Sequence, residues 1–121
     1  MAYINTTIAR PDAALSFGTM KPSDTGAFPK VIDLSKQDIN RLTFEAHCKG
    51  YAGSGSASVK LQASDDGSTW ADLGLSISNI SRDGQYTCPI KGFNKRYIKA
   101  VITGAAGITG GEVETEINSG V

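Results

Sequence analysis

The fold of this chain is decided by the segment RLTFEAHC, which occupies residues 41–48. Polar side chains fill every second position of this segment, and apolar ones fill the positions between them: Leu42, Phe44, Ala46 and Cys48. Successive side chains of a β-strand point to opposite faces of the sheet. The alternation therefore predicts a strand with one buried face and one solvated face.

The same alternation returns downstream, most clearly over residues 58–63, 85–90, 96–103 and 112–117, and more weakly over 75–81. The turn sequence Asp65-Asp66-Gly67-Ser68 predicts a hairpin, with a strand around residues 69–73 and Trp70 as its apolar anchor. Turn signals recur at roughly ten-residue spacing, which is typical of a sandwich or jelly roll. We therefore predict an all-β protein, a jelly-roll-like antiparallel β-sandwich with an extended N-terminal segment.

The first thirty residues contain Pro11, Pro22 and Pro29 and show no sustained period, yet they are rich in apolar side chains. Such a segment has to bury its apolar surface somewhere. One interpretation is an opening strand and a loop of the same sandwich; the other is an arm that lies across a neighbouring subunit. We accordingly divide the chain into an extended segment or arm, 1–30, and a sandwich domain, 31–121.

The bulk composition argues for a binding role within an assembly. The chain has 121 residues, which fits one domain, and its 12 basic and 12 acidic residues give a formal net charge of zero. We expect neither nucleic acid nor a membrane as partner, because both favour a basic excess. The N-terminal residues lack the pattern of a secretory signal. Cys48 and Cys88 are expected to be reduced core residues.

No catalytic constellation is evident in the sequence. A nucleophile system would have to use His47, the only histidine, but its neighbour Cys48 should point to the opposite face of the strand. The clusters that ligate zinc are missing, and the Gly-rich segment 104–111 lacks the ending of a phosphate-binding loop. We predict no enzyme, and no catalytic, cofactor or metal site.

Charged residues nevertheless gather in two places. Glu112, Glu114 and Glu116 should share one strand face, either as a device against unwanted strand pairing or as a salt-bridging face for a basic partner. A basic cluster lies near the start of another predicted strand: Lys91, Lys95, Arg96 and Lys99. Such patches on different surfaces suit head-to-tail or lattice contacts.

Two segments carry a resemblance to a known family. VKLQASDDGSTWADL (residues 59–73), followed by RYIKAVIT (96–103) and a Gly-then-strand ending, resembles the jelly-roll cement proteins of tailed-bacteriophage capsids, also called decoration or head-stabilising proteins. The resemblance covers roughly the latter two-thirds of the chain. It implies a viral structural protein, made in the host cytoplasm, that forms dimers or trimers on the capsid exterior and bridges subunits of the major capsid protein. It implies no catalytic residues.

Apolar content and loop length select the expected partner-binding positions: Tyr3, Ile4, Phe17, Phe28, Tyr51 and Ala105. The alternative function is a carbohydrate-binding or adhesin-type sandwich module of a phage tail. Sugar sites use exposed aromatic faces, and Tyr51 and Tyr97 are the candidates, since Trp70 and Tyr86 fit core positions better. A hydrolase would require turnover that depends on His47 or on the glutamate row.

Overall fold

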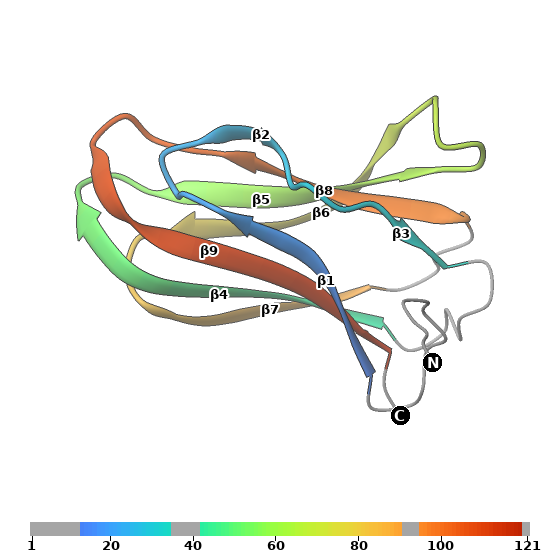
Figure 1. Cartoon of the computed structure of the whole chain (residues 1–121), viewed down its shortest axis with the longest axis horizontal. Coiled ribbons are helices and arrows are strands. Elements are labelled where there is room, and N and C mark those ends of the chain that lie inside the picture. Colours follow the sequence, from blue (N-terminus) through green and yellow to red (C-terminus); the bar gives the residue numbers. More distant parts are fainter. Residues whose placement is uncertain (1–12, 35–41, 91–94, 120–121) are drawn as a thin grey trace.

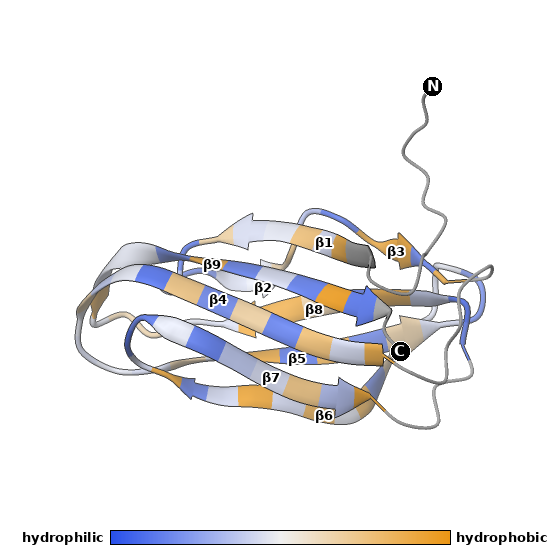
Figure 2. Cartoon of the chain, turned by 90° about the horizontal axis from the view of Figure 1, so that it is seen from below, coloured by the Kyte–Doolittle hydropathy of each residue, from blue (hydrophilic) through white to orange (hydrophobic). Residues whose placement is uncertain are grey.

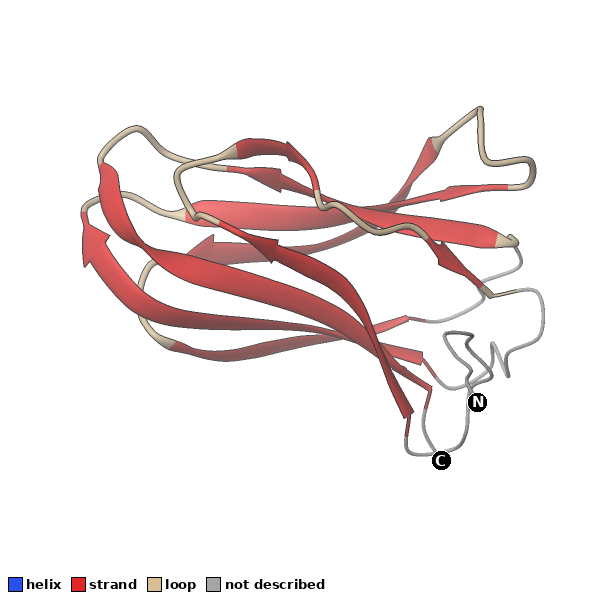
Figure 3. Ribbon diagram, in the orientation of Figure 1, coloured by secondary structure: helices blue, strands red, loops and turns tan. Residues whose placement is uncertain are grey.

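The computed structural model describes residues 13–34, 42–90 and 95–119, and every regular element in these ranges is a β-strand (Figures 1 and 3). In chain order the strands are β1 (Ala13–Met20), β2 (Thr25–Ala27), β3 (Ile32–Asp33), β4 (Leu42–Gly53), β5 (Ala57–Ser64), β6 (Ala71–Ile80), β7 (Gly84–Ile90), β8 (Tyr97–Thr103) and β9 (Ile108–Ser119). The prediction of an all-β protein is confirmed.

The strands form two antiparallel sheets that pack face to face (Figure 1). One sheet has the order β1-β9-β4-β7; the other has the order β2-β8-β5-β6, with β3 also paired to β8. The apolar positions of the alternating segments meet between the sheets, so that Phe44, Leu61 and Ile117 are fully buried. Burial of such side chains, at about 1.5–3 kcal/mol each, is the main force that holds the two sheets together.

The strand order is that of a jelly roll. The pairings nest within one another: β5 with β6, β4 with β7, β2 and β3 with β8, and β1 with β9. This nested ribbon is rolled up, so that β4 also pairs with β9 and β5 with β8. Rolling places successive strand pairs of the ribbon in alternate sheets, and it buries one face of each sheet. The predicted jelly-roll sandwich is therefore present.

Residues 13–30 belong to this sandwich. β1 pairs with β9 and β2 with β8, and Phe17 and Phe28 are 0% and 3% exposed within the core. The interpretation as an opening strand and a loop of the same sandwich therefore describes these residues. Residues 13–30 belong with the sandwich and not with a separate segment that ends at residue 30. Residues 1–12 lie outside the described residues.

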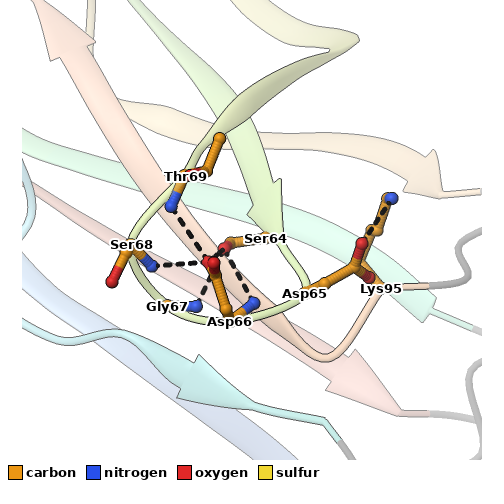
Figure 4. Close-up of polar contacts among 7 residues, drawn as sticks. All are labelled: Ser64, Asp65, Asp66, Gly67, Ser68, Thr69 and Lys95. Carbon is orange, nitrogen blue, oxygen red and sulfur yellow. Dashed lines mark hydrogen bonds and ion pairs between the residues drawn. The ribbon is translucent and has the colours of Figure 1, made fainter.

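The predicted turn at residues 65–68 is part of a longer loop between β5 and β6 (Figure 4). The Asp66 carboxylate accepts hydrogen bonds from the Ser64 hydroxyl and from the backbone N–H groups of Ser68 and Thr69. The Ser64 hydroxyl oxygen in turn accepts the N–H groups of Asp66 and Gly67. The side chains thus satisfy the backbone donors that a six-residue reversal, 65–70, leaves without strand partners.

Trp70 is not a core residue, which corrects the prediction from sequence. It lies in the β5–β6 loop rather than in a strand, and it is half-buried. The Lys99 ammonium nitrogen lies over its ring, 4.4 Å from the ring centroid. Lys99 alternates with the buried Ile98 and Ala100 on β8, so it points away from the core. The indole therefore covers the outer surface of the five-stranded sheet. By contrast, the predicted weak strand over 75–81 is confirmed as part of β6.

Candidate functional site

The outer face of the four-stranded sheet carries the glutamate row. Hydrophilic and hydrophobic positions alternate along β4 and β9 in Figure 2, because these strands turn one set of side chains to the core and the other to solvent. The strand register places Glu116 opposite Glu45, Glu114 opposite His47, and Glu112 opposite Lys49. The predicted charged face of β9 therefore lies directly beside the only histidine.

These side chains surround an open depression with a volume of about 510 Å³. It spans the outer surfaces of β1, β9 and β4 and is lined by Thr19, His47, Lys49, Glu112, Glu114 and Glu116. Sequence reasoning considered His47 and the glutamates separately. It missed their association because residues 47 and 114 become neighbours only through the β4–β9 pairing.

His47 lies between two carboxylates. Its Nε2 atom is 3.4 Å from Glu45 Oε1 and 3.7 Å from Glu116 Oε2. The imidazole is 39% exposed, whereas the side chains of Glu45 and Glu116 are only 16% and 20% exposed. His47 therefore lies on the solvated face of β4 beside Glu45, as the alternation within residues 41–48 predicts. The contact with Glu116 adds a partner that the sequence did not indicate.

Glu45 is held in place from two sides. The Gln85 side-chain amide on β7 donates to Glu45 Oε1 at 3.0 Å, and the Asn118 amide on β9 donates to Glu45 Oε2 at 2.6 Å. Both donors are neutral, so they orient the carboxylate without cancelling its charge. Among the described residues, its only ion-pair partner is His47.

The charges of the two outer surfaces are balanced differently. On the side of the five-stranded sheet, basic residues are matched to aspartates: Lys60 with Asp72, Lys95 with Asp65, and Arg96 with Asp33. Within the described ranges, by contrast, Glu112 and Glu114 form neither an ion pair nor a hydrogen bond. The depression itself is lined by three glutamates and by one lysine, Lys49, so acidic side chains are in excess there. Lys91 of the predicted basic cluster is outside the described residues.

Cys48 cannot act with His47. The thiol lies on the inner, core side of β4, as its position next to His47 in the strand requires, and it is 4% exposed. Burial raises the pKa of the Cys48 thiol, and the nearby charge of Asp83 raises it further. Both effects keep the sulfur protonated and unreactive. Cys88, the other free cysteine, is half-buried and packs against the core.

Of the six expected partner-binding residues, the structure describes four, and these fall into two groups. Tyr3 and Ile4 lie outside the described residues. Phe17 and Phe28 are core residues, so they are not available to contact a partner in this structure, which corrects that expectation. Apolar content does not distinguish a side chain that binds a partner from one that fills the core.

Tyr51 and Ala105 do lie close together, at one end of the sandwich. The Tyr51 hydroxyl donates to the Gly55 carbonyl at 2.5 Å, and a Cβ atom on Gly55 would lie 3.1 Å from Ala105 Cβ. The backbone joins the same loops, since Ser54 N–H donates to the Gly107 carbonyl at 2.9 Å. Both side chains are half-buried, which leaves a small ordered surface made of two loops.

The aromatic residues considered for sugar binding are partly covered. The Arg96 guanidinium lies 4.8 Å from the centroid of the Tyr97 ring, and Lys99 occupies one face of Trp70. The Tyr51 hydroxyl is already bonded to backbone. A stacking platform needs an open ring face, so these contacts weigh against sugar binding at these positions.

Comparison with known proteins adds no family. No model of a known protein family matches the chain, and no curated protein is significantly similar to it. In the described ranges no helix is long and apolar enough to cross a membrane.

Proposed function

We propose that this protein is a capsid cement protein of a tailed bacteriophage. It binds the exterior of the head as a homo-oligomer, a dimer or trimer, and stabilises the shell by bridging neighbouring subunits of the major capsid protein. The resemblance of residues 59–73 and 96–103 to that family supports the proposal, and the jelly-roll strand order is the fold that the resemblance implies.

The observation that carries the binding role is the excess of acidic side chains around the depression, where Glu112, Glu114 and Glu116 outnumber a single lysine, Lys49. Glu112 and Glu114 lie exposed on β9 with no cation paired to them among the described residues, although the chain as a whole is neutral. Complementary charge steers association and fixes register more than it adds affinity. We therefore assign the outer face of β1, β9 and β4 to a basic surface of the major capsid protein.

Binding is favoured over catalysis by the surroundings of His47. Its ion-pair partners in the described part of the chain are two carboxylates, and the hydroxyl that lines the depression belongs to Thr19 on a separate strand. A nucleophile–base system needs a hydroxyl or thiol within hydrogen-bond reach of the imidazole.

Several copies of a modest interface give firm attachment to a shell. Once one subunit of an oligomer is bound, the others bind at a high effective concentration. If only the expanded, mature shell presents the complete site, binding also stabilises that state by linkage. A carbohydrate-binding tail module is the second candidate, and the covered aromatic rings make it the weaker one.

The proposal is tested by mixing the purified protein with undecorated mature capsids and with procapsids. We expect saturable uptake by the mature shells, together with raised resistance of those shells to heat. Failure to co-sediment with either shell would reject the proposal. A glycan array with a clear hit that is lost in Tyr97→Ala would favour the tail module instead.

A further inference from the structure

Three potential metal ligands converge on the outer face of the four-stranded sheet. Glu45 and His47 lie two residues apart on β4, and Glu116 faces Glu45 from β9. One oxygen from each glutamate and one imidazole nitrogen all lie within 4.8 Å of one another. The imidazole distinguishes this group from a plain row of carboxylates, since it adds a nitrogen ligand between two oxygen ligands.

The pairing of Glu45 with Glu116 is unfavourable without a cation. Like charges directly opposite each other on neighbouring strands destabilise a sheet, and both of these side chains are more than three-quarters buried. Neither carboxylate has a described Lys or Arg within ion-pair distance; each has only His47. A bound divalent cation would cancel both charges at once and relieve this repulsion.

The distances match the ligand shell of zinc. Zinc binds imidazole nitrogen and carboxylate oxygen at about 2.0–2.2 Å in tetrahedral geometry, which separates neighbouring ligand atoms by about 3.4 Å. The observed separations from His47 Nε2 are 3.4 Å to Glu45 Oε1 and 3.7 Å to Glu116 Oε2. The third separation, between the ligand oxygens of Glu45 and Glu116, is at most 4.8 Å, so a bound ion would draw the two carboxylates toward each other.

The surroundings of the three ligands also fit. The amides of Gln85 and Asn118 fix the orientation of Glu45, as hydrogen bonds to metal-binding carboxylates commonly do. On the solvent side, the depression beside His47 and Glu116 leaves space for a fourth ligand. Three protein ligands with one open position is a common arrangement for zinc.

We propose that Glu45, His47 and Glu116 form a binding site for a divalent transition-metal ion, with Zn²⁺ as the ion that best suits two carboxylates and one imidazole. The fourth position faces the depression and holds water or a ligand from a partner. This inference goes beyond the proposed function and does not depend on capsid binding, because it concerns the protein alone.

The test uses the untagged protein in a buffer that does not chelate metals. Calorimetric titration with Zn²⁺ should show one ion bound per chain. Co²⁺, used as a spectroscopic probe, should give the visible absorption of a tetrahedral site. Because His47 is the only histidine, its imidazole NMR signals should shift on addition of Zn²⁺ without any need for assignment by mutation. A Cys88→Ser background removes the more accessible thiol as a competing ligand.

Single substitutions distinguish a specific metal site from nonspecific binding of Zn²⁺ to acidic side chains. Glu116→Gln and His47→Ala should each weaken Zn²⁺ binding at least about tenfold. Glu112→Gln is the matched control: it removes the same charge from the same strand face but none of the three ligands, and it should bind as the parent does. Absence of saturable binding, an unshifted imidazole signal, or an equal loss in Glu112→Gln would overturn the proposal. Circular dichroism of each variant confirms that the sandwich is folded.

Discussion

Phe17 of β1 meets Phe44 of β4 edge to face, with ring centroids 6.0 Å apart and ring planes at 85°. Both side chains are 0% exposed. The pair spans two strands that are not neighbours in the sheet, since β9 lies between them. Phe17 thus attaches the first strand to the centre of the core, although it comes from the part of the sequence with no regular period.

Phe17→Ala should lower the free energy of unfolding by about 3–5 kcal/mol, because it removes a fully buried ring and leaves a cavity beside Phe44. Chemical denaturation with urea measures the change. Val31→Ala is a suitable control, since Val31 is 50% exposed and its truncation should be nearly neutral. A loss below about 1 kcal/mol for Phe17→Ala would contradict the assignment of β1 to the core.

Deletion of residues 1–28 should unfold the protein rather than release an arm. It removes β1 and β2, and with them Phe17, Phe28 and the strand that covers the edge of β9. Circular dichroism and thermal melting of the truncated chain measure the outcome. A folded truncation product would show that β1 is dispensable. Deletion of residues 1–12 is the companion experiment, because it tests Tyr3 and Ile4 as capsid contacts with β1 left in place.

Gly18→Ala should destabilise the fold by about 1–3 kcal/mol. Gly18 sits at a bulge in β1 with φ +110°, and a Cβ atom there would lie 2.5 Å from Pro29 Cγ. Gly74→Ala is the control, because Gly74 also has a positive φ of +76° but has no atom within 4 Å of the added Cβ. Equal losses in the two variants, measured by urea denaturation, would mean that backbone strain alone matters and the contact with Pro29 does not.

Thr115→Val should stabilise the protein by about 1 kcal/mol. Thr115 is fully buried on β9, and its hydroxyl has no hydrogen-bond partner among the described residues. Valine has nearly the same shape without the hydroxyl, so the substitution removes a desolvation penalty and keeps the packing. Thr115→Ser, which keeps the hydroxyl and loses the methyl group, should instead lower the melting temperature. A destabilised valine variant would indicate a partner for the hydroxyl.

Protonation of Asp66 at low pH should lower the free energy of unfolding of the protein. Hydrogen bonds from the N–H groups of Thr69 and Ser68, and then from the Ser64 hydroxyl, lower the pKa of Asp66 from its usual 3.8 to about 2. The folded state therefore holds the proton less tightly than the unfolded chain, so this stabilisation is complete above about pH 4 and is lost as the pH falls toward 2. NMR titration of the carboxyl group measures the pKa directly. Ser64→Ala should raise it, and an unchanged value would exclude the hydroxyl as a cause.

Capsid binding should depend on salt and on the exposed glutamates. An exposed ion pair contributes about 0.5 kcal/mol, so Glu112→Gln combined with Glu114→Gln should weaken binding roughly fivefold and reduce its salt dependence. The matched control changes the same number of charges on the other side of the molecule, with Asp65→Asn and Asp72→Asn. Equal effects of the two double variants would show that net charge, and not the acidic face, governs binding.

Period-two patterning located most strands from residue 42 onward and the side of each that is buried, but the strands predicted around 69–73 and over 75–81 are one strand, β6 (Ala71–Ile80), and β9 begins at Ile108, earlier than predicted. The pattern is a local property: neighbouring residues of an extended chain point to opposite faces whatever the strand pairs with. The strand within residues 13–30 was not evident from this pattern because Phe17 sits at a bulge, where the regular alternation of β1 is interrupted. Trp70 was misassigned because a large apolar side chain was expected to enter the core, whereas its strand begins only at Ala71.

The sequence by itself determined that this is an all-β sandwich, that Glu112, Glu114 and Glu116 share a solvated face, and that His47 and Cys48 point apart. Only the tertiary structure decided what faces the glutamates. Glu116 meets Glu45 and His47 because β4 and β9, separated by more than fifty residues of chain, pair in one particular register. Register depends on turn geometry and on which faces become buried in the whole sandwich, and a shift by one residue would turn Glu116 into the core and separate it from His47.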